Sequence, residues 1–595
     1  CHTDTHEYST SYDRRMKGTS PSLSHAELLG RTYKRSLSTR ARKKTGVFYT
    51  PENIAHSMVQ ECLSKRQDTD TPPTVLDPSC GAGIFLVTAL RELFRIYSPK
   101  TTEEGEHLLS TCIFGTDRDP QAVELTKRCL RLELREWARA HRLSPPRSLS
   151  LAQNIRCGDS LLDWTNHPWS TPLAQHQAFR WKHAFPQQLI TKSGFDLVLG
   201  NPPYGLSRGE QLSPFENSWL KENYDSIRVG KVNKYILFLA RSLGLLHENG
   251  HLAFLIPNAW LGIRSGEKLR RLLCENKYLE HLVIFETALF EDPQVEAVIV
   301  FASRASHKKD SFSLTRSSSP SWKSCEQHQT LKYSLCTNDP ECLIPTHWTP
   351  EVSTLFAHIQ EHSQPLTHFG FRPMIALQAY AAGKGTPPQS KEDVKQHTFH
   401  SSEKLSEEYY PYLQGKDVGR YSLTWSGSYL RHGKWLAEPQ KLSRFSGPRI
   451  LLREITRPTP HVLVGTFTNE VYLYNKSVLH ILPNEDTSEA SLLALLAILH
   501  SPLASFVLAF RGRKSQRKLF PKIVNRDLQT FPVTNNFLSF IPQLSQLAQE
   551  LLDPSLDSNQ REQVEIEVNE LVCQAYQLTP SLIRKLDSCL ARSAI

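Results

Sequence analysis

The 595-residue chain lacks several signals that mark common classes of protein. No apolar run approaches the roughly 18 residues that would cross a membrane, and no secretory signal is visible at the N-terminus. The twelve cysteines form no CxxC pair and have no histidine partners at zinc-like spacing, which favours free thiols in a reducing cytoplasm and no metal site. The glycine pattern GxGxxG is also absent, so a dinucleotide-binding site is not expected.

Basic residues outnumber acidic ones, 70 to 60, which gives a net charge of +10. Much of the excess lies in two runs, RTYKRSLSTRARKK at residues 31–44 and RGRKSQRK at residues 511–518. A single run of this kind is as often a solvated face or a disordered arm as a binding site. Two such runs in one chain favour nucleic acid as the partner.

The order of predicted elements divides the chain into five segments. Residues 1–45 form a polar, basic arm with a helical connector. Apolar strands alternate with helical stretches over residues 46–305, which predicts an open α/β sheet covered on both faces. Residues 306–349 are polar and rich in serine and lysine, as in a linker. Short aromatic strands over 350–535 predict a second domain, and 536–595 a helical tail.

Glycines and acids follow the ends of three predicted strands. DPSCGAG, at residues 77–83, follows the first strand and opens a helix, so its glycines let the backbone approach a ligand. The next strand ends in GTDRDP with Asp117, and a third ends in GDS with Asp159. Taken singly, such acids are often helix caps or turn formers. Three acids in this order on successive strands predict a binding site for S-adenosylmethionine, with the ribose of the cofactor at Asp117 and its adenine at Asp159. The candidate cofactor-binding residues of the glycine turn are Asp77, Pro78, Gly81 and Gly83.

The stretch FDLVLGNPPYG, at residues 195–205, places a rigid tetrapeptide where a buried strand ends. Asn201 offers a side-chain amide oxygen and Pro202 a backbone carbonyl, and two such acceptors can take both hydrogens of an exocyclic amino group. Pro202 and Pro203 fix the backbone and hold the acceptors in place. Tyr204 offers an aromatic face to a planar base. The tetrapeptide is therefore a candidate catalytic clamp that needs neither a metal nor a strong general base.

In this order, VLDPSCGAGIFL, IFGTDRDP, GDSLLDW and FDLVLGNPPYG resemble the motifs of γ-class DNA adenine-N6 methyltransferases of the TaqI-like and type IIG restriction–modification kind. GVFYTPENIAHSMV is similar to the motif that precedes the glycine turn in that class, and the resemblance covers residues 28–305. It implies a Rossmann-like, S-adenosylmethionine-dependent methyltransferase domain with a C-terminal α+β target-recognition domain. It also implies that Thr50 touches the methionine end of the cofactor and that Phe290 stacks on a flipped adenine. An ordinary place in the core is the alternative for Phe290.

Beyond residue 350 the resemblance is looser, although YYPYLQGKDVGRY and LFPKIVNRDLQTFPV are similar to blocks of the type IIG specificity domain. It implies that this part binds double-stranded DNA through basic side chains on phosphates. Each candidate could equally be a plain surface residue. The candidate DNA contacts are Arg372, Lys384, Lys416, Arg449, Arg453, Arg511, Arg513, Lys514, Arg517 and Lys518.

The sequence thus predicts a site-specific DNA methyltransferase that acts on adenine N6 in a restriction–modification or similar defence system. An amino-methyltransferase acting on RNA or on a protein glutamine, and a non-catalytic DNA-specificity subunit, remain as alternatives. The chain starts at Cys1 rather than methionine and shows no PD…ExK nuclease pattern. It is therefore either a standalone methylase or the C-terminal part of a fused enzyme, with a cognate nuclease domain or subunit as a further partner and no membrane.

Overall fold

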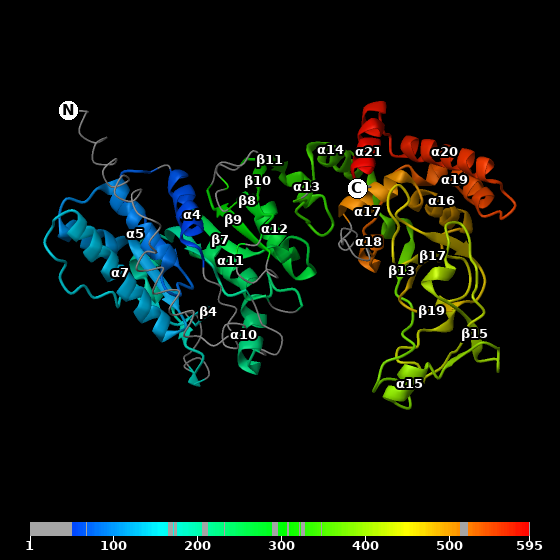
Figure 1. The fold of residues 1–595 in the computed structure, drawn as a ribbon, viewed down its shortest axis with the longest axis horizontal. Helices are drawn as coiled ribbons and strands as arrows, with labels where there is room; N and C mark the ends of the chain where they lie inside the picture. The colour runs from blue at the N-terminus through cyan, green and yellow to red at the C-terminus, as the bar shows by residue number, and fades with distance from the viewer. Residues whose placement is uncertain are drawn as a thin grey trace. The chain divides into compact units, whose positions relative to one another are not determined.

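The computed structural model describes residues 50–593 apart from residues 67, 165–169, 172–174, 205–211, 231–232, 288, 290–295, 306–308, 320–321, 323–327, 347 and 512–521. The chain divides into two compact units, Cys1–Ile344 and Pro345–Ile595 (Figure 1). The predicted arm over 1–45 and its basic run lie outside the described residues.

A nine-stranded sheet forms the centre of the first unit. Its strands are β1 (Val75–Asp77), β2 (Ile113–Asp117), β3 (Ile155–Cys157), β6 (Phe195–Gly200), β7 (Leu246–Pro257), β8 (Leu279–Phe285), β9 (Ala297–Ser303), β10 (Ser311–Ser317) and β11 (His328–Lys332). Their order is β11-β10-β8-β9-β7-β6-β1-β2-β3. The strands from β3 to β7 in this order are parallel, whereas β9 is antiparallel to both of its neighbours. A small separate sheet pairs β4 (Asp159–Asp163) with β5 (Ala178–Phe179).

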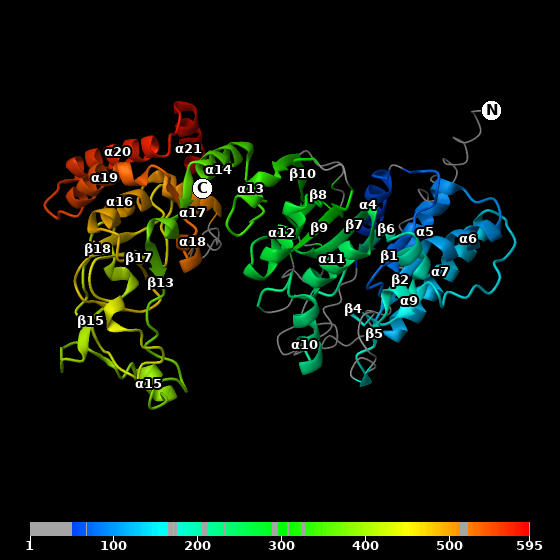
Figure 2. The ribbon, with the colours of Figure 1, turned by 180° about the vertical axis from the view of Figure 1, so that it is seen from behind.

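Helices pack against this sheet and against one another (Figure 2). They are α4 (Glu52–Ser64), α5 (Ile84–Tyr97), α6 (Thr102–Cys112), α7 (Pro120–Ala140), α9 (Trp181–Ala184), α10 (Pro214–Asn223), α11 (Lys234–Leu245), α12 (Glu267–Glu275) and α13 (Tyr333–Thr337). Leu197, Val198 and Leu199 of β6 are all fully buried. Burial of successive residues on both faces is typical of a parallel strand covered by helices on both sides, as the apolar run after Asp196 in β6 predicts.

The chain order places a switch point beside β1. From β1 the sheet continues through β2 and β3 on one side, and through β6 and β7 on the other. In open α/β sheets, the carboxyl ends of the strands at such a point border the ligand-binding crevice. Asp77 ends β1, Asp117 ends β2 and Gly200 ends β6. The fold therefore brings the glycine turn and the NPPY tetrapeptide to one edge of the sheet.

The prediction that residues 306–349 form a linker is wrong. Within this segment β10 pairs with β8, and β11 pairs with β10, so the sheet extends by two strands. Phe312 and Leu314 are buried at alternate positions of β10. This short period-two pattern is hidden in a serine- and lysine-rich composition, and composition alone therefore suggests a loop.

The second unit combines short sheets with helices. Its strands are β12 (Ser363–Pro365), β13 (Phe371–Met374), β14 (His400–Ser401), β15 (Tyr409–Leu413), β16 (Tyr429–Arg431), β17 (Arg449–Arg453), β18 (Gly465–Thr468), β19 (Leu473–Tyr474), β20 (Val478–Pro483) and β21 (Pro532–Thr534). They form sheets in the orders β13-β20-β17-β18, β14-β16-β15-β19 and β12-β21. The helices are α14 (Pro350–Glu361), α15 (Lys391–Gln396), α16 (Glu489–Leu499), α17 (Pro502–Arg511), α18 (Asn525–Gln529), α19 (Phe537–Leu551), α20 (Ser558–Ala575) and α21 (Pro580–Ser593).

The apolar helix α16 belongs to the core of this second unit. Its residues from Leu492 to Leu499 are all buried, and it packs against α19. In the part of the chain that the structure describes, no single helix is long and apolar enough to cross a membrane. Helices α16 and α17 are long and apolar enough only when taken together, and the two helix axes differ by 68° at the break between them.

Candidate functional site

The glycine turn and the NPPY tetrapeptide meet at the carboxyl ends of β1 and β6. The two strands pair in parallel, with Leu76 beside Val198. A Cβ atom added to Gly200 would lie 3.0 Å from Oδ1 of Asp77. The residue before Asn201 is therefore in close contact with the first acid of the glycine turn, and a side chain larger than glycine would disturb that approach.

The glycine turn itself is open on one side. Gly81 and Gly83 have φ angles of +53° and +86°, which side chains with a Cβ rarely adopt. A Cβ on Gly81 would meet nothing within 4 Å, whereas one on Gly83 would meet Thr126 at 3.0 Å. The positive φ angle thus favours glycine at both positions, and packing against Thr126 also excludes a side chain at Gly83. The space beside Gly81, at the N-terminal end of α5, is where a ligand can approach the backbone.

Asp77 and Asp117 border this turn, Asp159 lies on β4, and burial raises the pKa of each. The pKa of Asp77 rises to about 8, because burial and the neighbouring Asp117 outweigh a hydrogen bond from the backbone N–H of Ser79. Burial also raises the pKa of Asp117, which accepts hydrogen bonds from the backbone N–H groups of Gly81 and Asp119, both at 2.9 Å. Such a group of buried acids is costly to ionise and gains from a bound cation.

Asp159 is the third of these carboxylates. It lies at the start of β4, where its side chain is 14% exposed. Its carboxylate accepts a hydrogen bond from the N–H of Leu161, and its Oδ2 lies 3.8 Å from Nη1 of the exposed Arg118. Burial raises the pKa of Asp159 despite both contacts.

The residues at this edge fit a cationic, polar cofactor. The hydroxyl of Ser79 is buried and has no hydrogen-bond partner among the described residues, so it can serve a ligand at the turn. The acids supply negative charge and acceptors, and the glycine turn supplies a close backbone approach. Ionised Asp77 would repel a phosphate, whereas the sulfonium and ammonium groups of S-adenosylmethionine would stabilise its ionised form.

The NPPY tetrapeptide is more enclosed than the sequence suggests. Pro202 is buried, Pro203 is half-buried and Tyr204 is 9% exposed. Burial raises the pKa of Tyr204 well above its ordinary value. Nδ2 of Asn201 also donates to Oγ1 of Thr50 at 3.0 Å. Thr50, which the resemblance assigns to the cofactor, thus contacts the residue predicted to hold the target amine.

Several predicted site residues cannot be placed. Phe290, the candidate for stacking on the second face of the base, lies outside the described residues, and its role stays a prediction. Most of the second basic run is also undescribed: Arg513, Lys514, Arg517 and Lys518. Arg511, at the end of α17, donates from Nη1 to the carbonyl and hydroxyl oxygens of Thr530.

Four of the candidate DNA contacts in the second unit reach its surface to different degrees. Lys416 and Arg372 are exposed, and Arg372 donates to the carbonyl oxygen of Pro483 at 2.9 Å. Lys384 forms an exposed ion pair with Glu438, and Arg453 is half-buried. These side chains remain candidates for phosphate contact.

The prediction that Arg449 contacts DNA is wrong. This residue starts β17 and is fully buried. Its guanidinium donates to the carbonyl oxygens of Gly447 at 2.7 Å and Glu470 at 2.6 Å, and to the hydroxyl of Tyr474 at 3.2 Å. Because its N–H groups donate to acceptors inside the second unit, Arg449 stabilises the fold of that unit and does not contact DNA.

A pair of variants separates these roles. We expect Arg449→Met to lower the free energy of unfolding of the second unit by about 2–4 kcal/mol, because buried carbonyl oxygens lose their donors. Lys416→Ala should change stability by less than about 0.5 kcal/mol and should weaken DNA binding with a smaller salt dependence. Urea titrations and DNA-binding isotherms at several salt concentrations measure both effects. Unchanged stability in Arg449→Met would contradict the structural role.

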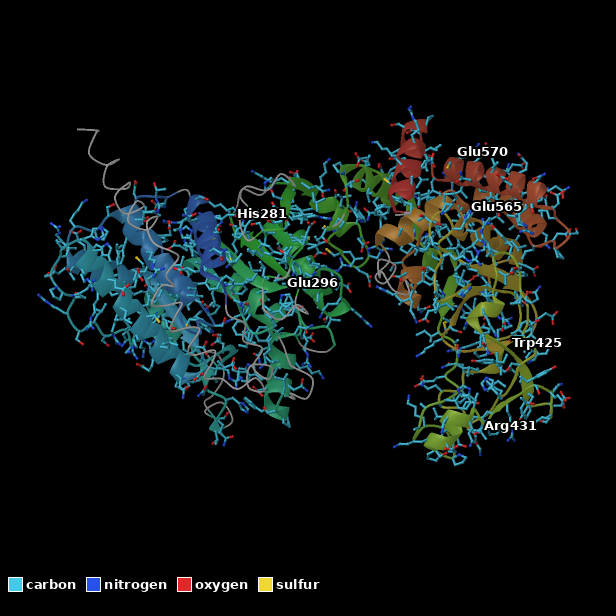
Figure 3. All side chains as sticks on the ribbon, viewed as in Figure 1. His281, Glu296, Trp425, Arg431, Glu565 and Glu570 are labelled. Atoms are coloured by element: carbon cyan, nitrogen blue, oxygen red, sulfur yellow. The ribbon has the colours of Figure 1, made fainter. Side chains whose placement is uncertain are left out.

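The stacked pair of Arg431 and Trp435 in the second unit was missed by the sequence reasoning (Arg431 is labelled in Figure 3). The guanidinium of Arg431 lies 4.1 Å from the ring centre of Trp435, and the Arg431 side chain is 41% exposed. An ion pair with Glu408 at 2.8 Å holds it further. A stacked, partly exposed arginine is well suited to phosphate or base contact. The alternation of basic and aromatic residues in YLRHGKW was the available signal.

Comparisons with known proteins divide the chain in the same way. Residues 111–290 match the family described as Eco57I restriction-modification methylase, and residues 410–533 match the TaqI-like C-terminal specificity domain. The first range includes Asp117, Asp159 and Asn201, and the second lies within the second unit. These matches confirm the resemblance to restriction–modification methylases and the predicted fold class.

Individual relatives agree. The chain is 27% identical over 284 residues to the type II restriction enzyme and methyltransferase RM.Eco57I of Escherichia coli, covering 44% of this chain and 28% of that protein. It is 24% identical over 279 residues to the type II methyltransferase M.AccI of Acinetobacter calcoaceticus, covering 46% and 39%. The chain thus spans less than two fifths of the length of either relative. In fold, it is similar to the type IIL restriction-modification enzyme MmeI in complex with DNA, with a TM-score of 0.51, 12% identity and coverage of 95% of this chain and 81% of that one.

Proposed function

We propose that this chain, which carries an Eco57I-like restriction–modification methylase domain and a TaqI-like C-terminal specificity domain, methylates the N6 amino group of adenine at specific sites in double-stranded DNA, with S-adenosylmethionine as methyl donor. The observation that carries the proposal is the contact between Gly200 and Asp77. This contact supports the proposal that the acceptors of the NPPY tetrapeptide lie beside the turn that would hold the cofactor. One relative is named as a type II restriction enzyme and methyltransferase and the other as a type II methyltransferase, which supports a role in a restriction–modification system.

The chain's own residues would activate the amine by accepting its hydrogens. The lone pair of adenine N6 is delocalised into the ring, which makes the amine a poor nucleophile. Oδ1 of Asn201 and the carbonyl oxygen of Pro202 can each accept one hydrogen bond from the amino group. Both acceptors stabilise the positive charge that develops on the nitrogen during its attack on the methyl group. The two prolines hold the acceptors in advance, so that little reorganisation is needed.

The glycine turn and its acids would hold the cofactor. Asp77, Pro78, Gly81 and Gly83 border its amino-acid end, Asp117 its ribose and Asp159 its adenine. When bound, the sulfonium supplies both the methyl group and a good leaving group, so that no metal is required. Once ionised, Asp77 would supply the counter-charge of the bound cation, and the hydroxyl of Ser79 would add a polar contact.

The target base must leave the duplex to reach this pocket, which costs a few kcal/mol. Stacking of the base on an aromatic side chain offsets this cost by about 1–3 kcal/mol per base. Tyr204 would supply one such face, and Phe290 is the candidate for the other. Residues 46–305 would therefore carry the chemistry.

Residues 350–535 would recognise the DNA, with 536–595 as a helical tail. The exposed Lys416 and Arg372 and the stacked Arg431 are candidates for these contacts. A cognate nuclease domain or subunit is a further partner that the type II relatives support, since RM.Eco57I is named as both restriction enzyme and methyltransferase.

A labelling experiment tests the proposed function. The protein is incubated with S-adenosylmethionine carrying a tritiated methyl group and with genomic DNA from a strain that lacks adenine methylation. We expect the label in DNA, as N6-methyladenine after nucleoside digestion, and confined to one sequence context in single-molecule sequencing. Total RNA and a protein extract serve as matched acceptors. Label in RNA or in a protein glutamine, with none in DNA, would overturn the proposal in favour of another amino-methyltransferase.

A further inference from the structure

The side chain of Asn201 is held by a residue far away in the sequence. Its Nδ2 donates to Oγ1 of Thr50 at 3.0 Å, and the two residues are separated by 151 positions. Thr50 is 2% exposed, so water cannot easily take the place of its hydroxyl. We propose that Thr50 is a positioning residue that orients the Asn201 amide with its oxygen toward the target amine. This inference rests on the proposed function, because it assigns the amide oxygen to that amine.

The need for such a residue follows from the shape of an amide. Its oxygen and its NH₂ group are similar in size, and rotation about χ2 is broad, so sterics alone do not choose which end faces the substrate. If the NH₂ group of Asn201 faced the amine, donor would meet donor. In the reactive orientation the NH₂ group points into the protein and needs an acceptor there, because a buried donor without a partner is costly. In the structure the hydroxyl of Thr50 is that acceptor, with Nδ2 of Asn201 as the donor.

Helix α4 makes Thr50 a firm support. Thr50 precedes Pro51, the N-cap of this helix, and Ile54 and Met58 are fully buried against the core. At the start of α4, Glu52 pairs with Arg91, which is also bound by Glu133.

The far end of α4 is tied to the sheet. Glu61 accepts hydrogen bonds from Nδ1 of His281 on β8 at 2.7 Å and from Nε1 of Trp322 at 3.1 Å. Burial would raise the pKa of Glu61, but the hydrogen bond from His281 and the charge of Lys65 hold it at about 2, so this anchor stays ionised at neutral pH. Helix α4 is therefore fixed at both ends and holds the Thr50 hydroxyl in a constant position beside Asn201.

Two variants at one position separate positioning from cofactor contact. Thr50→Val removes the hydroxyl with little change in shape, and Thr50→Ser keeps it. We expect kcat for DNA methylation to fall about 10- to 100-fold in Thr50→Val and to stay within about threefold in Thr50→Ser. Calorimetric titration with S-adenosylhomocysteine should give a Kd within about twofold of the unchanged protein for both variants. A weakened Kd with unchanged kcat would overturn the proposal and restore Thr50 to the cofactor.

The orientation of the amide can be read in the free protein without any reaction. In the full chain labelled with ¹⁵N-asparagine, the side-chain NH₂ signal of Asn201 is identified by its loss in Asn201→Asp. We expect this signal to shift in Thr50→Val and not in Thr50→Ser. Thr88→Val is the matched control, because the Thr88 hydroxyl is equally buried but donates to the carbonyl of Ile84 at 2.7 Å.

The amide signal of Asn201 tests the positioning role of Thr50, and methyl transfer to DNA tests the proposed function, so either hypothesis can fail without the other. An Asn201 signal that is identical in Thr50→Val overturns the positioning role, whatever the activity. If the unchanged protein transfers no methyl group to DNA, the proposed function fails, and the amide signal still decides whether Thr50 orients Asn201.

Discussion

Replacing Asn201 with alanine is expected to lower kcat for DNA methylation by about 10³-fold. The side chain supplies one of two acceptors for the hydrogens of the target amine, and its removal would leave only the carbonyl of Pro202. Because the acceptor acts mainly as charge develops on nitrogen, its loss should appear in kcat more than in KM. Single-turnover methylation of a duplex that contains the recognition sequence measures this effect.

Binding in this variant should be nearly normal. The acids of the glycine turn that fit the cofactor are unchanged, and the second unit retains all of its basic surface. We therefore expect S-adenosylhomocysteine and DNA to bind Asn201→Ala within about threefold of the unchanged protein. Asn249→Ala, at an exposed position of β7, is the control for a lost asparagine. Full methylation by Asn201→Ala would contradict the assigned role of the NPPY tetrapeptide.

The parts of this site that were predictable are local in the sequence. An apolar run that ends in NPPY predicts β6 and the place of Asn201, and the structure ends β6 at Gly200. The glycines at 81 and 83 predict a turn before a helix, and α5 starts at Ile84. In both cases the residues that define the turn adjoin the strand or helix that presents them, so a short window contains the whole signal.

The parts that were not predictable depend on contacts between distant residues. The hydrogen bond between Thr50 and Asn201 cannot be predicted from the residues around either position, because a threonine before Pro51 indicates only that a helix is about to begin. Arg449 was wrongly assigned to DNA because a buried arginine and a surface arginine look the same in a basic, apolar stretch. Its partners come from backbone carbonyls and from Tyr474, which only the folded unit brings together.

Replacing Asp77 with asparagine is expected to stabilise the free protein while it disables cofactor binding. The amide oxygen of the new side chain can still accept the hydrogen bond from the N–H of Ser79, which is 2.9 Å from the present carboxylate. The variant cannot carry a negative charge, however, and a cation bound beside it loses its counter-charge. Removing one partner of a buried charge pair costs about 2–5 kcal/mol, so the affinity for S-adenosylmethionine should fall by at least about 30-fold.

The gain in stability should depend on pH in a defined direction. Burial raises the pKa of Asp77 to about 8 in the folded protein, well above the value of 3.8 for an exposed aspartate. The folded state therefore holds the proton more tightly than the unfolded state. The stabilisation from this group is fully present below pH 3.8 and is lost as the pH rises through 8, at up to about 1.4 kcal/mol per pH unit. Asp77→Asn should match the unchanged protein near pH 4 and exceed it by a few kcal/mol near pH 8.

The same carboxyl group links cofactor binding to proton release. At pH 7 most of the free protein carries a proton on Asp77, and a bound cation favours the ionised form, so binding should release up to one proton and tighten as the pH rises toward 8. Calorimetric titrations in buffers with different ionisation enthalpies measure that proton, and thermal unfolding from pH 5 to 9 measures the stability difference. Asp70→Asn, at an exposed position, should alter neither. If Asp77→Asn binds S-adenosylmethionine as tightly as the unchanged protein, Asp77 does not face the cofactor, and the charge argument for a sulfonium at this turn fails.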